Sequence, residues 1–462
     1  MNNLEKPEFI LQLEEFIDSI VQNGDEPKML SQLHQSTMKY DIQNVDPLNP
    51  YASFKDCNFD IDDAIGELTN SKIIAEMLLL RSWNTFKTAK YNTIFSVTIQ
   101  LAKLYQAIND HSSVVSESEH VHLYFEDALN TSPDDFNIIG GICDILYYEL
   151  RAKNELNEPF DKTMEMINEY IPFLIVAADK DKYKLNAALI IGQIADIFVN
   201  KMKYEEACQF YPKVIQIITQ IENLDAINKR VYAIFTGHYS VALLGCNHKD
   251  WDAIRNSILI EETLYKQLHE TFGDIRSKMD LAIAYSHKGS YYEQNKDYKN
   301  ASDCHFLKIQ LITETFQLEN NEGEYTEDAR IDSLLNSMQP IINYGLLSNM
   351  KERIHTFKKV YSMLFNILNY KFDIRLLRYT NAFAMEIFKA SDGINDEEAE
   401  IFLFKKINVL VNLIVDYGME DGIMSDLKQT IKESKPFVDR MGKKLQEHNK
   451  QVWQTVNQVF QV

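Results

Sequence analysis

Three segments of similar sequence recur in the middle of the chain, and they constrain the fold more than any other feature. They lie at 200–207 (Asn-Lys-Met-Lys-Tyr-Glu-Glu-Ala), 247–253 (Asn-His-Lys-Asp-Trp-Asp-Ala) and 295–301 (Asn-Lys-Asp-Tyr-Lys-Asn-Ala). Their closing alanines are 46 and 48 residues apart. An apolar stretch with helical periodicity stands on either side of each segment. This arrangement predicts helical hairpins, in which the polar turn ends one helix and the small alanine lets the next helix pack closely.

The residues before each alanine follow the tetratricopeptide pattern of an aromatic, a small and an aromatic residue. The residues at these positions are Tyr285, Gly289 and Tyr292 in the third segment, Ile191, Ala195 and Phe198 in the first, and Gly237, Val241 and Leu244 in the second, a poorer match. The intervals exceed the usual repeat of about 34 residues, which indicates longer helices. The alternative interpretation is an unrelated helical bundle with fortuitous alanines. We therefore predict an all-α fold, a tetratricopeptide-like α-solenoid in which antiparallel helix pairs form a right-handed superhelix.

Composition and periodicity suggest how this fold is divided. With 15 glycines and 10 prolines in 462 residues, the chain lacks the turn chemistry of a β-rich fold. Helical periodicity is clear at 9–20, is interrupted at 41–62 and again near 320–327, and is strong elsewhere. The acidic residues at 60–63 are interpreted as a helix start, since acidic side chains favour helix N-termini. The predicted parts are an N-terminal acidic helix and linker at 1–62, tetratricopeptide-like repeats at 63–320 and a C-terminal helical-repeat lobe at 328–462.

The sequence also suggests where the chain works. It shows no run of 18 apolar residues and no signal peptide at its start, so we expect no membrane insertion. Its five cysteines are scattered and form no C-x-x-C pair, which is typical of reduced thiols. We therefore expect a cytoplasmic protein.

The charge balance bears on the kind of partner. The formal net charge is −21, and residues 1–70 alone hold 14 acidic and 4 basic side chains. Residues 425–462 reverse the sign, with 7 basic and 4 acidic side chains. Phosphate backbones and anionic membranes would be repelled, so we expect no nucleic-acid partner and favour a protein with a basic surface. The alternative is that the acidic charge only keeps a helical surface soluble.

No pattern of residues calls for catalysis. The chain lacks the nucleotide-binding, zinc-protease, serine-hydrolase and calcium-loop motifs. We therefore expect neither enzymatic activity, nor a cofactor, nor a metal. An enzyme on a helical scaffold stays open as an alternative, and it would need a buried cluster of titratable groups.

In a tetratricopeptide stack the first helix of each pair lines the concave groove, and its exposed side chains contact the bound partner. Counting back from the alanines places six polar residues on that face. They are Asp196 and Asn200 in the first repeat, His238 in the second, and Ser286, Ser290 and Glu293 in the third. Such a groove suits a polar, basic helix, although these groups could also face only water.

The helix–turn–helix at 197–207 (Ile-Phe-Val-Asn-Lys-Met-Lys-Tyr-Glu-Glu-Ala) resembles the kinesin-binding protein family of tetratricopeptide-like proteins. The segment at 280–292 (Asp-Leu-Ala-Ile-Ala-Tyr-Ser-His-Lys-Gly-Ser-Tyr-Tyr) is similar to a later repeat of that family. Segments at 378–391 and 411–417, followed by a helix at 428–444, resemble its final helices. The resemblance covers roughly 183–445, and this chain is considerably shorter than the family's members.

The resemblance implies a non-enzymatic regulator that grips the kinesin motor domain and hides its microtubule-binding face. It also implies that Gln193, together with Asp196 and Asn200, lies on the helix that lines the motor-binding groove, and that the protein associates with the cytoskeleton. Two other interpretations remain open. One is a generic tetratricopeptide adaptor that assembles another complex, and the other is a repeat regulator that a bound peptide switches between conformations.

Overall fold

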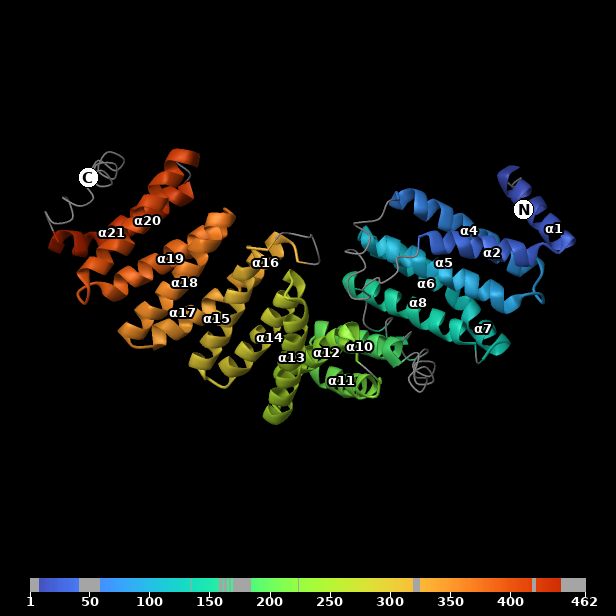
Figure 1. The fold of residues 1–462 in the computed structure, drawn as a ribbon, viewed down its shortest axis with the longest axis horizontal. Helices are drawn as coiled ribbons and strands as arrows, with labels where there is room; N and C mark the ends of the chain where they lie inside the picture. Colours follow the sequence, from blue (N-terminus) through green and yellow to red (C-terminus); the bar gives the residue numbers. More distant parts are fainter. Residues whose placement is uncertain are drawn as a thin grey trace. The chain divides into compact units, whose positions relative to one another are not determined.

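The chain is described by a computed structural model that covers residues 8–40, 59–133, 135–157, 184–222, 224–318, 325–417 and 421–441, and the single positions 161, 164, 165 and 168. Within these ranges every regular element is a helix (Figure 1). The chain forms two compact units, unit 1 (Met1–Leu264) and unit 2 (Tyr265–Val462). The division falls inside α13 (Trp251–Phe272), which contributes residues to both units.

Unit 1 is built from two layers of helices. The helices that we call the inner helices are α2 (Glu26–Lys39), α5 (Lys87–Ala107), α8 (Phe136–Glu155), α10 (Lys184–Asn200) and α12 (Ala226–Gly245). Each inner helix packs against the next one in this order. The other helices that lie wholly in unit 1 are α1 (Glu8–Asn23), α4 (Ile61–Arg81), α6 (His111–Val121), α7 (Phe125–Thr131) and α11 (Tyr204–Thr219), with a short 3-10 turn at His122–Tyr124.

Short polar residues start several of these helices. Asp60 accepts hydrogen bonds from the backbone N–H groups of Asp62 and Asp63, and so caps α4. Asp135 caps α8 and Asp225 caps α12 in the same way. Since a side-chain cap satisfies donors that the helix cannot, each contributes about 1 kcal/mol. The prediction that residues 60–63 start a helix is confirmed.

The polar turns predicted from the repeats end their helices with a left-handed residue. In the first turn, Met202 has a φ of 57°, and Lys203 N–H donates to the Phe198 carbonyl at 2.8 Å. In the third turn, Lys296 has a φ of 62°, and Asp297 N–H donates to the Tyr292 carbonyl at 2.9 Å. Such a hydrogen bond, from a backbone N–H to the carbonyl five residues earlier, satisfies a carbonyl group that the end of the helix would leave without a partner. The second segment lacks it, since its first helix ends at Cys246 in an extended conformation.

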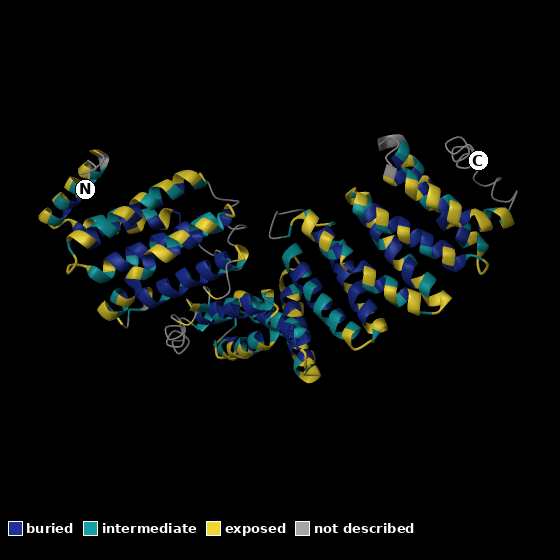
Figure 2. Cartoon of the chain, turned by 180° about the vertical axis from the view of Figure 1, so that it is seen from behind, coloured by how far each residue is buried: buried dark blue, intermediate teal, exposed yellow. Residues whose placement is uncertain are grey.

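Small residues sit where paired helices approach most closely. Ala207 and Ala301 are buried, as the hairpin prediction requires, whereas Ala253 is only half-buried. A Cβ atom at Gly289 of α14 would lie 2.8 Å from His305 Nε2 on α15, so only glycine fits there without a shift. Most of the buried residues are apolar, and buried and exposed positions lie on different faces of the helices (Figure 2). The pairs are therefore held by burial of apolar surface.

Unit 2 continues the same organisation. Its helices are α14 (Ile275–Gln294), α15 (Tyr298–Thr315), α16 (Glu327–Leu335), α17 (Met338–Leu347), α18 (Met350–Tyr370), α19 (Ile374–Ser391), α20 (Asp396–Tyr417) and α21 (Asp421–Met441). From α17 to α21 each helix packs on the next, and α15 contacts α14, α16, α17 and α18. Edge-to-face ring pairs link Phe357 to Phe383 at 5.4 Å and Phe388 to Phe437 at 5.2 Å. Such pairs add to the burial of apolar area.

The all-α, tetratricopeptide-like prediction is confirmed. The acidic segment at 1–62 holds two helices, α1 and α2, rather than one. The linker predicted at 41–62 lies mostly outside the described residues, and so does most of the break near 320–327. The lobe boundary placed there stays a prediction. Over the described helices, none combines the length and hydrophobicity that crossing a bilayer requires.

Candidate functional site

Two predicted site residues from different repeats meet on the inner helices. The Nδ1 atom of His238 on α12 lies 2.8 Å from Oδ1 of Asp196 on α10. The buried hydroxyl of Tyr211 donates to the same carboxylate oxygen at 2.7 Å. Burial opposes protonation of the imidazole, but the charge of Asp196 and its hydrogen bond outweigh it and raise the pKa of His238. Asp196 therefore favours a charged His238 on a partly exposed surface.

A glycine lets a second carboxylate approach this pair. A Cβ atom at Gly237 would lie 2.4 Å from Oε1 of Glu261 on α13, which is buried. The charge of Glu261 adds to the rise in the pKa of His238. The imidazole is thus hydrogen-bonded to one carboxylate and is also influenced by the charge of a second one on a neighbouring helix. A carboxylate that hydrogen bonds hold in place can attract the cationic groups of a partner without first having to rearrange.

The other two predicted residues of α10 share the helix face of Asp196. Gln193, Asp196 and Asn200 recur at three- and four-residue spacing, which puts them on one stripe. The Asn200 side chain donates to Oδ1 of Asn154, at the end of α8, at 2.9 Å. Gln193 is half-buried on the same stripe. The stripe is polar along its whole length.

The predicted residues of unit 2 lie on α14, and two of them approach buried groups of α15. Nζ of Lys308 lies 3.4 Å from the Ser286 hydroxyl, and Nε2 of His305 lies 3.9 Å from a Glu293 carboxylate oxygen. The Ser290 hydroxyl donates to the Ser286 carbonyl of its own helix at 3.1 Å. Burial lowers the pKa of Lys308 to about 8 and that of His305 to about 4. The predicted polar residues of α14 therefore also make contacts within the α14–α15 pair, Ser286 and Glu293 with α15 and Ser290 within α14.

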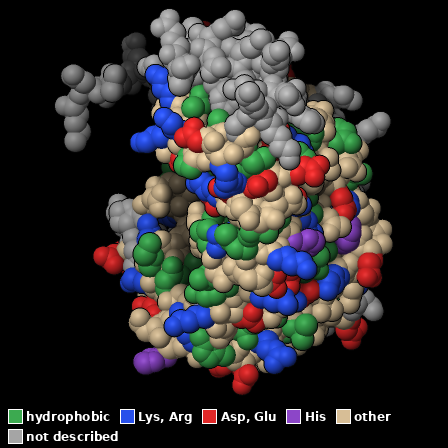
Figure 3. Space-filling model, turned by 90° about the vertical axis from the view of Figure 1, so that its left-hand side faces the viewer, with side chains coloured by type: hydrophobic (Ala, Val, Ile, Leu, Met, Phe, Trp, Pro, Cys, Tyr) green, Lys and Arg blue, Asp and Glu red, His purple; other side chains and the backbone are tan. Residues whose placement is uncertain are grey.

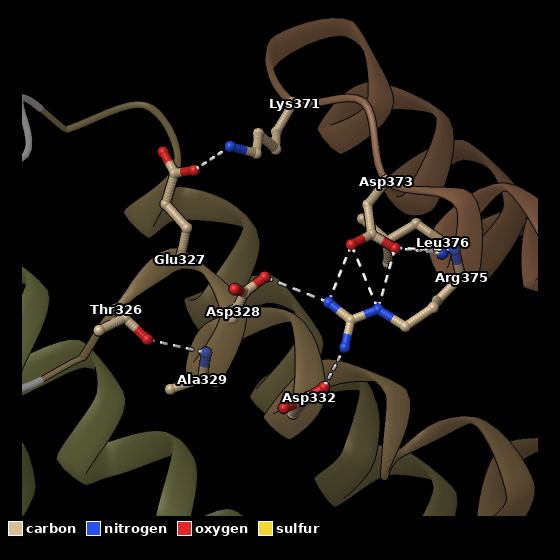
Figure 4. Close-up of polar contacts among 9 residues, drawn as sticks. All are labelled: Thr326, Glu327, Asp328, Ala329, Asp332, Lys371, Asp373, Arg375 and Leu376. Carbon is tan, nitrogen blue, oxygen red and sulfur yellow. Dashed lines mark hydrogen bonds and ion pairs between the residues drawn. The ribbon is translucent and has the colours of Figure 1, made fainter.

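Several basic side chains in unit 2 are paired with acidic ones. Arg375 at the start of α19 contacts three aspartates, Asp328, Asp332 and Asp373 (Figure 4). The adjacent Lys371 pairs with Glu327 of α16 in the same view (Figure 4). On the face shown in Figure 3, basic, acidic and apolar side chains are interspersed. Among the described side chains on that face, charges of one sign do not gather into an extended patch.

The site prediction missed one feature, a cavity of about 660 Å³ on the inner helices α2, α5 and α8. Its polar lining includes Asn92 and Ser96 of α5, and Asn137 and Asp144 of α8. Asn92 and Ser96 are four residues apart, and Asn137 and Asp144 are seven apart. This helical spacing is the only signal of the cavity that the sequence carried, and no alanine of the three repeats lies near these residues. Among the described residues no group of three His, Cys, Asp or Glu side chains could hold a metal.

Comparison with known proteins gives no argument about the fold or the function of this chain. No family model and no curated protein sequence matches this chain. Among the matching solved structures is a human IFIT1 dimer with PPP-AAAA, 12% identical, covering 83% of this chain and 94% of that one, with a TM-score of 0.20. A likeness at that score carries no argument about function. What the structure itself establishes is an all-α, tetratricopeptide-like helical-repeat scaffold.

Proposed function

We propose that this chain is a non-enzymatic scaffold whose inner helices bind a basic protein surface, and that the partner is a kinesin motor domain. The observation that carries the proposal is the contact of Asp196, on the polar stripe of α10, with His238 of α12, whose pKa the charge of Glu261 also raises. The resemblance of 197–207 and 280–292 to the kinesin-binding protein family supports the choice of partner. A microtubule-binding surface must be basic because tubulin is acidic, so an acidic scaffold can compete for it.

Electrostatics should govern the encounter. The net charge of −21 produces a field that speeds association with a cationic partner. The screening length is about 30 Å at 0.01 M salt and about 10 Å at 0.1 M, so added salt weakens this attraction. The same charge disfavours nucleic acids, so a protein remains the proposed partner.

The direct test is co-sedimentation of purified kinesin motor domains with microtubules, with and without this protein. We expect the motor domains to move from the pellet to the supernatant as the protein is added. Asp196→Asn should require a higher concentration for the same effect, because it removes the charge but keeps an oxygen that accepts the Tyr211 hydroxyl. Glu126→Gln is the matched control, because Glu126 is an exposed acid on α7, outside the inner helices.

Motor domains that stay in the pellet at every concentration would contradict the kinesin proposal. If motor domains also fail to bind the protein in the absence of microtubules, a generic adaptor for another complex becomes the better interpretation. Equal effects of Asp196→Asn and Glu126→Gln would show that only overall charge matters, and not the inner helices.

A further inference from the structure

The cavity on α2, α5 and α8 has the size and the chemistry of a binding site. Its volume of about 660 Å³ falls in the range of about 300–1,000 Å³ typical of ligand sites. One wall is α2, with Ser31 and His34, and the opposite wall is α8, with Asn137. Apolar atoms of Leu30 and Ile99 complete the lining. Polar groups thus converge from three helices on one space.

Close packing of α5 and α8 forms the base of this cavity. A Cβ atom at Gly141 would lie 3.1 Å from Cβ of Phe95, tighter than most such contacts. Gly140 and Gly141 both line the cavity, so α8 presents backbone rather than side chains there. The side chains on either side, Asn137 and Asp144, border this open stretch. Between them no side chain of α8 larger than glycine lines the cavity.

Asn92 on α5 carries a polar atom that lacks a partner. Its Oδ1 atom is buried, and within the described part of the chain no donor reaches it. A buried acceptor without a hydrogen bond costs about 1–3 kcal/mol, so such a group is usually satisfied in the working state. Rotation of the amide exchanges its oxygen and nitrogen, so either group can meet a ligand. A peptide group, which carries one donor and one acceptor, matches such an amide.

Asp144 brings a negative charge to the same cavity. Its carboxylate is half-buried and accepts a hydrogen bond from the Asn186 side chain of α10. Burial raises the pKa of Asp144 to about 6, even though the charge of Lys103 and the bond from Asn186 oppose that rise. The carboxylate is therefore incompletely compensated. A cationic ligand group would stabilise it, whereas a phosphate would be repelled.

We propose that this cavity binds an extended peptide segment that carries one Lys or Arg, with the cation on Asp144 and the peptide backbone on the amides of Asn92 and Asn137. Neighbouring helices are about 8–10 Å apart, and an extended chain rises about 3.3 Å per residue. A chain that crosses three inner helices therefore spans about six residues. This site is separate from the His238 cluster, and the proposal does not depend on the kinesin proposal.

The test is selection from a displayed library of random hexapeptides on the immobilised full-length chain. The enriched peptides are then labelled with fluorescein, and their affinities are measured by fluorescence polarisation. We expect enrichment of Lys or Arg at one position and little preference elsewhere. Replacing that basic residue by Gln should weaken binding to the unmodified protein by about 10- to 100-fold, as for a charge-assisted hydrogen bond.

Asp144→Asn should weaken binding of the basic peptide by the same factor. The variant should also bind the basic peptide and the Gln peptide equally, since the change in the protein and the change in the peptide remove the same interaction. Asn92→Ala should weaken both peptides equally. Should Asn92→Ala reduce helicity, the exposed Asn137 allows the same test through Asn137→Ala. Glu126→Gln serves again as the control that changes charge outside the cavity.

Three results would overturn this inference. The first is a selection that enriches no peptide, or peptides without a basic residue. The second is an Asp144→Asn protein that still prefers the basic peptide. The third is a single-stranded RNA oligonucleotide that competes with the enriched peptide, which would indicate a different class of ligand.

Discussion

Replacing Glu26 by glutamine removes one charge of a buried ion pair that fastens α2 to α5. Nζ of Lys90 lies 2.8 Å from Oε1 of Glu26, with the lysine side chain 0% exposed and the glutamate side chain 6% exposed. Lys90 also donates to the Ser82 carbonyl at 2.9 Å, and Thr85 donates to the other glutamate oxygen at 3.0 Å. Glutamine keeps the shape of the side chain, but leaves the ammonium group without a counter-charge.

Breaking one partner of a buried pair costs about 3–5 kcal/mol. The hydrogen bonds from Lys90 to Ser82 survive the change, so we expect the lower end, a loss of about 3 kcal/mol in the free energy of unfolding of unit 1. The double variant Glu26→Leu/Lys90→Met removes both charges and should recover most of that loss, since a buried pair and its apolar replacement are often nearly equal in stability.

Urea unfolding followed by tryptophan fluorescence measures this loss, since Trp83 lies next to Ser82 and its ring stacks under Lys87 at 4.5 Å. Far-UV circular dichroism on the same samples reports the helices of both units. An unfolding midpoint unchanged by Glu26→Gln would refute the reasoning. So would a double variant as unstable as the single one, because the loss would then reflect packing rather than an unpaired charge.

The same pair predicts an acid dependence. Burial opposes ionisation of Glu26, but hydrogen bonds from Lys90, Ser82 and Thr85 together lower its pKa below the ordinary 4.5. A lowered pKa in the folded state means that the stabilisation is fully present above about pH 4.5 and is lost as pH falls through the folded-state value. Glu26→Gln should lack this part of the acid dependence.

Three further predictions follow from single positions. Met202→Gly should stabilise unit 1 by about 1 kcal/mol in urea unfolding, because the exposed Met202 adopts a positive φ that glycine tolerates; a destabilised variant would contradict this. Gly192→Ala should destabilise by about 1–3 kcal/mol, since its Cβ would lie 2.1 Å from the Phe235 ring; an unchanged melting temperature would contradict the packing. The raised pKa of His238 means that its pairing with Asp196 stabilises the fold below about pH 6.5 and that this stabilisation is lost as pH rises through the folded-state pKa; Asp196→Asn should remove that pH dependence of the melting temperature.

Local patterns predicted the parts of the fold that depend on neighbouring residues. The Asn-Lys turns at 200 and 295 close helices in the same way, and Ala207 and Ala301 are buried at the crossings. The turn at 247 does not close its helix in this way, because the chain leaves the helix in an extended conformation at Cys246. The repeat pattern was therefore reliable where the turn chemistry was complete.

Pairings between distant residues could not be predicted. Asp196 and His238 are 42 residues apart, and Glu26 and Lys90 are 64 apart, so their contacts depend on how helix pairs stack. The cavity of α2, α5 and α8 was missed for the same reason, because Asn92 has no repeat anchor from which to count. In α14, Ser286 was predicted to face the groove, but whether it also meets a buried lysine depends on the packing of α15.

The most direct test of the central claim is the dissociation constant of the full-length chain and a kinesin motor domain, measured between 0.01 and about 0.15 M salt. If the inner helices hold a basic surface, the affinity should fall steeply as salt rises, and Asp196→Asn should reduce both the affinity and its salt dependence. Binding that is independent of salt, or identical for Asp196→Asn and the unmodified protein, would contradict the account.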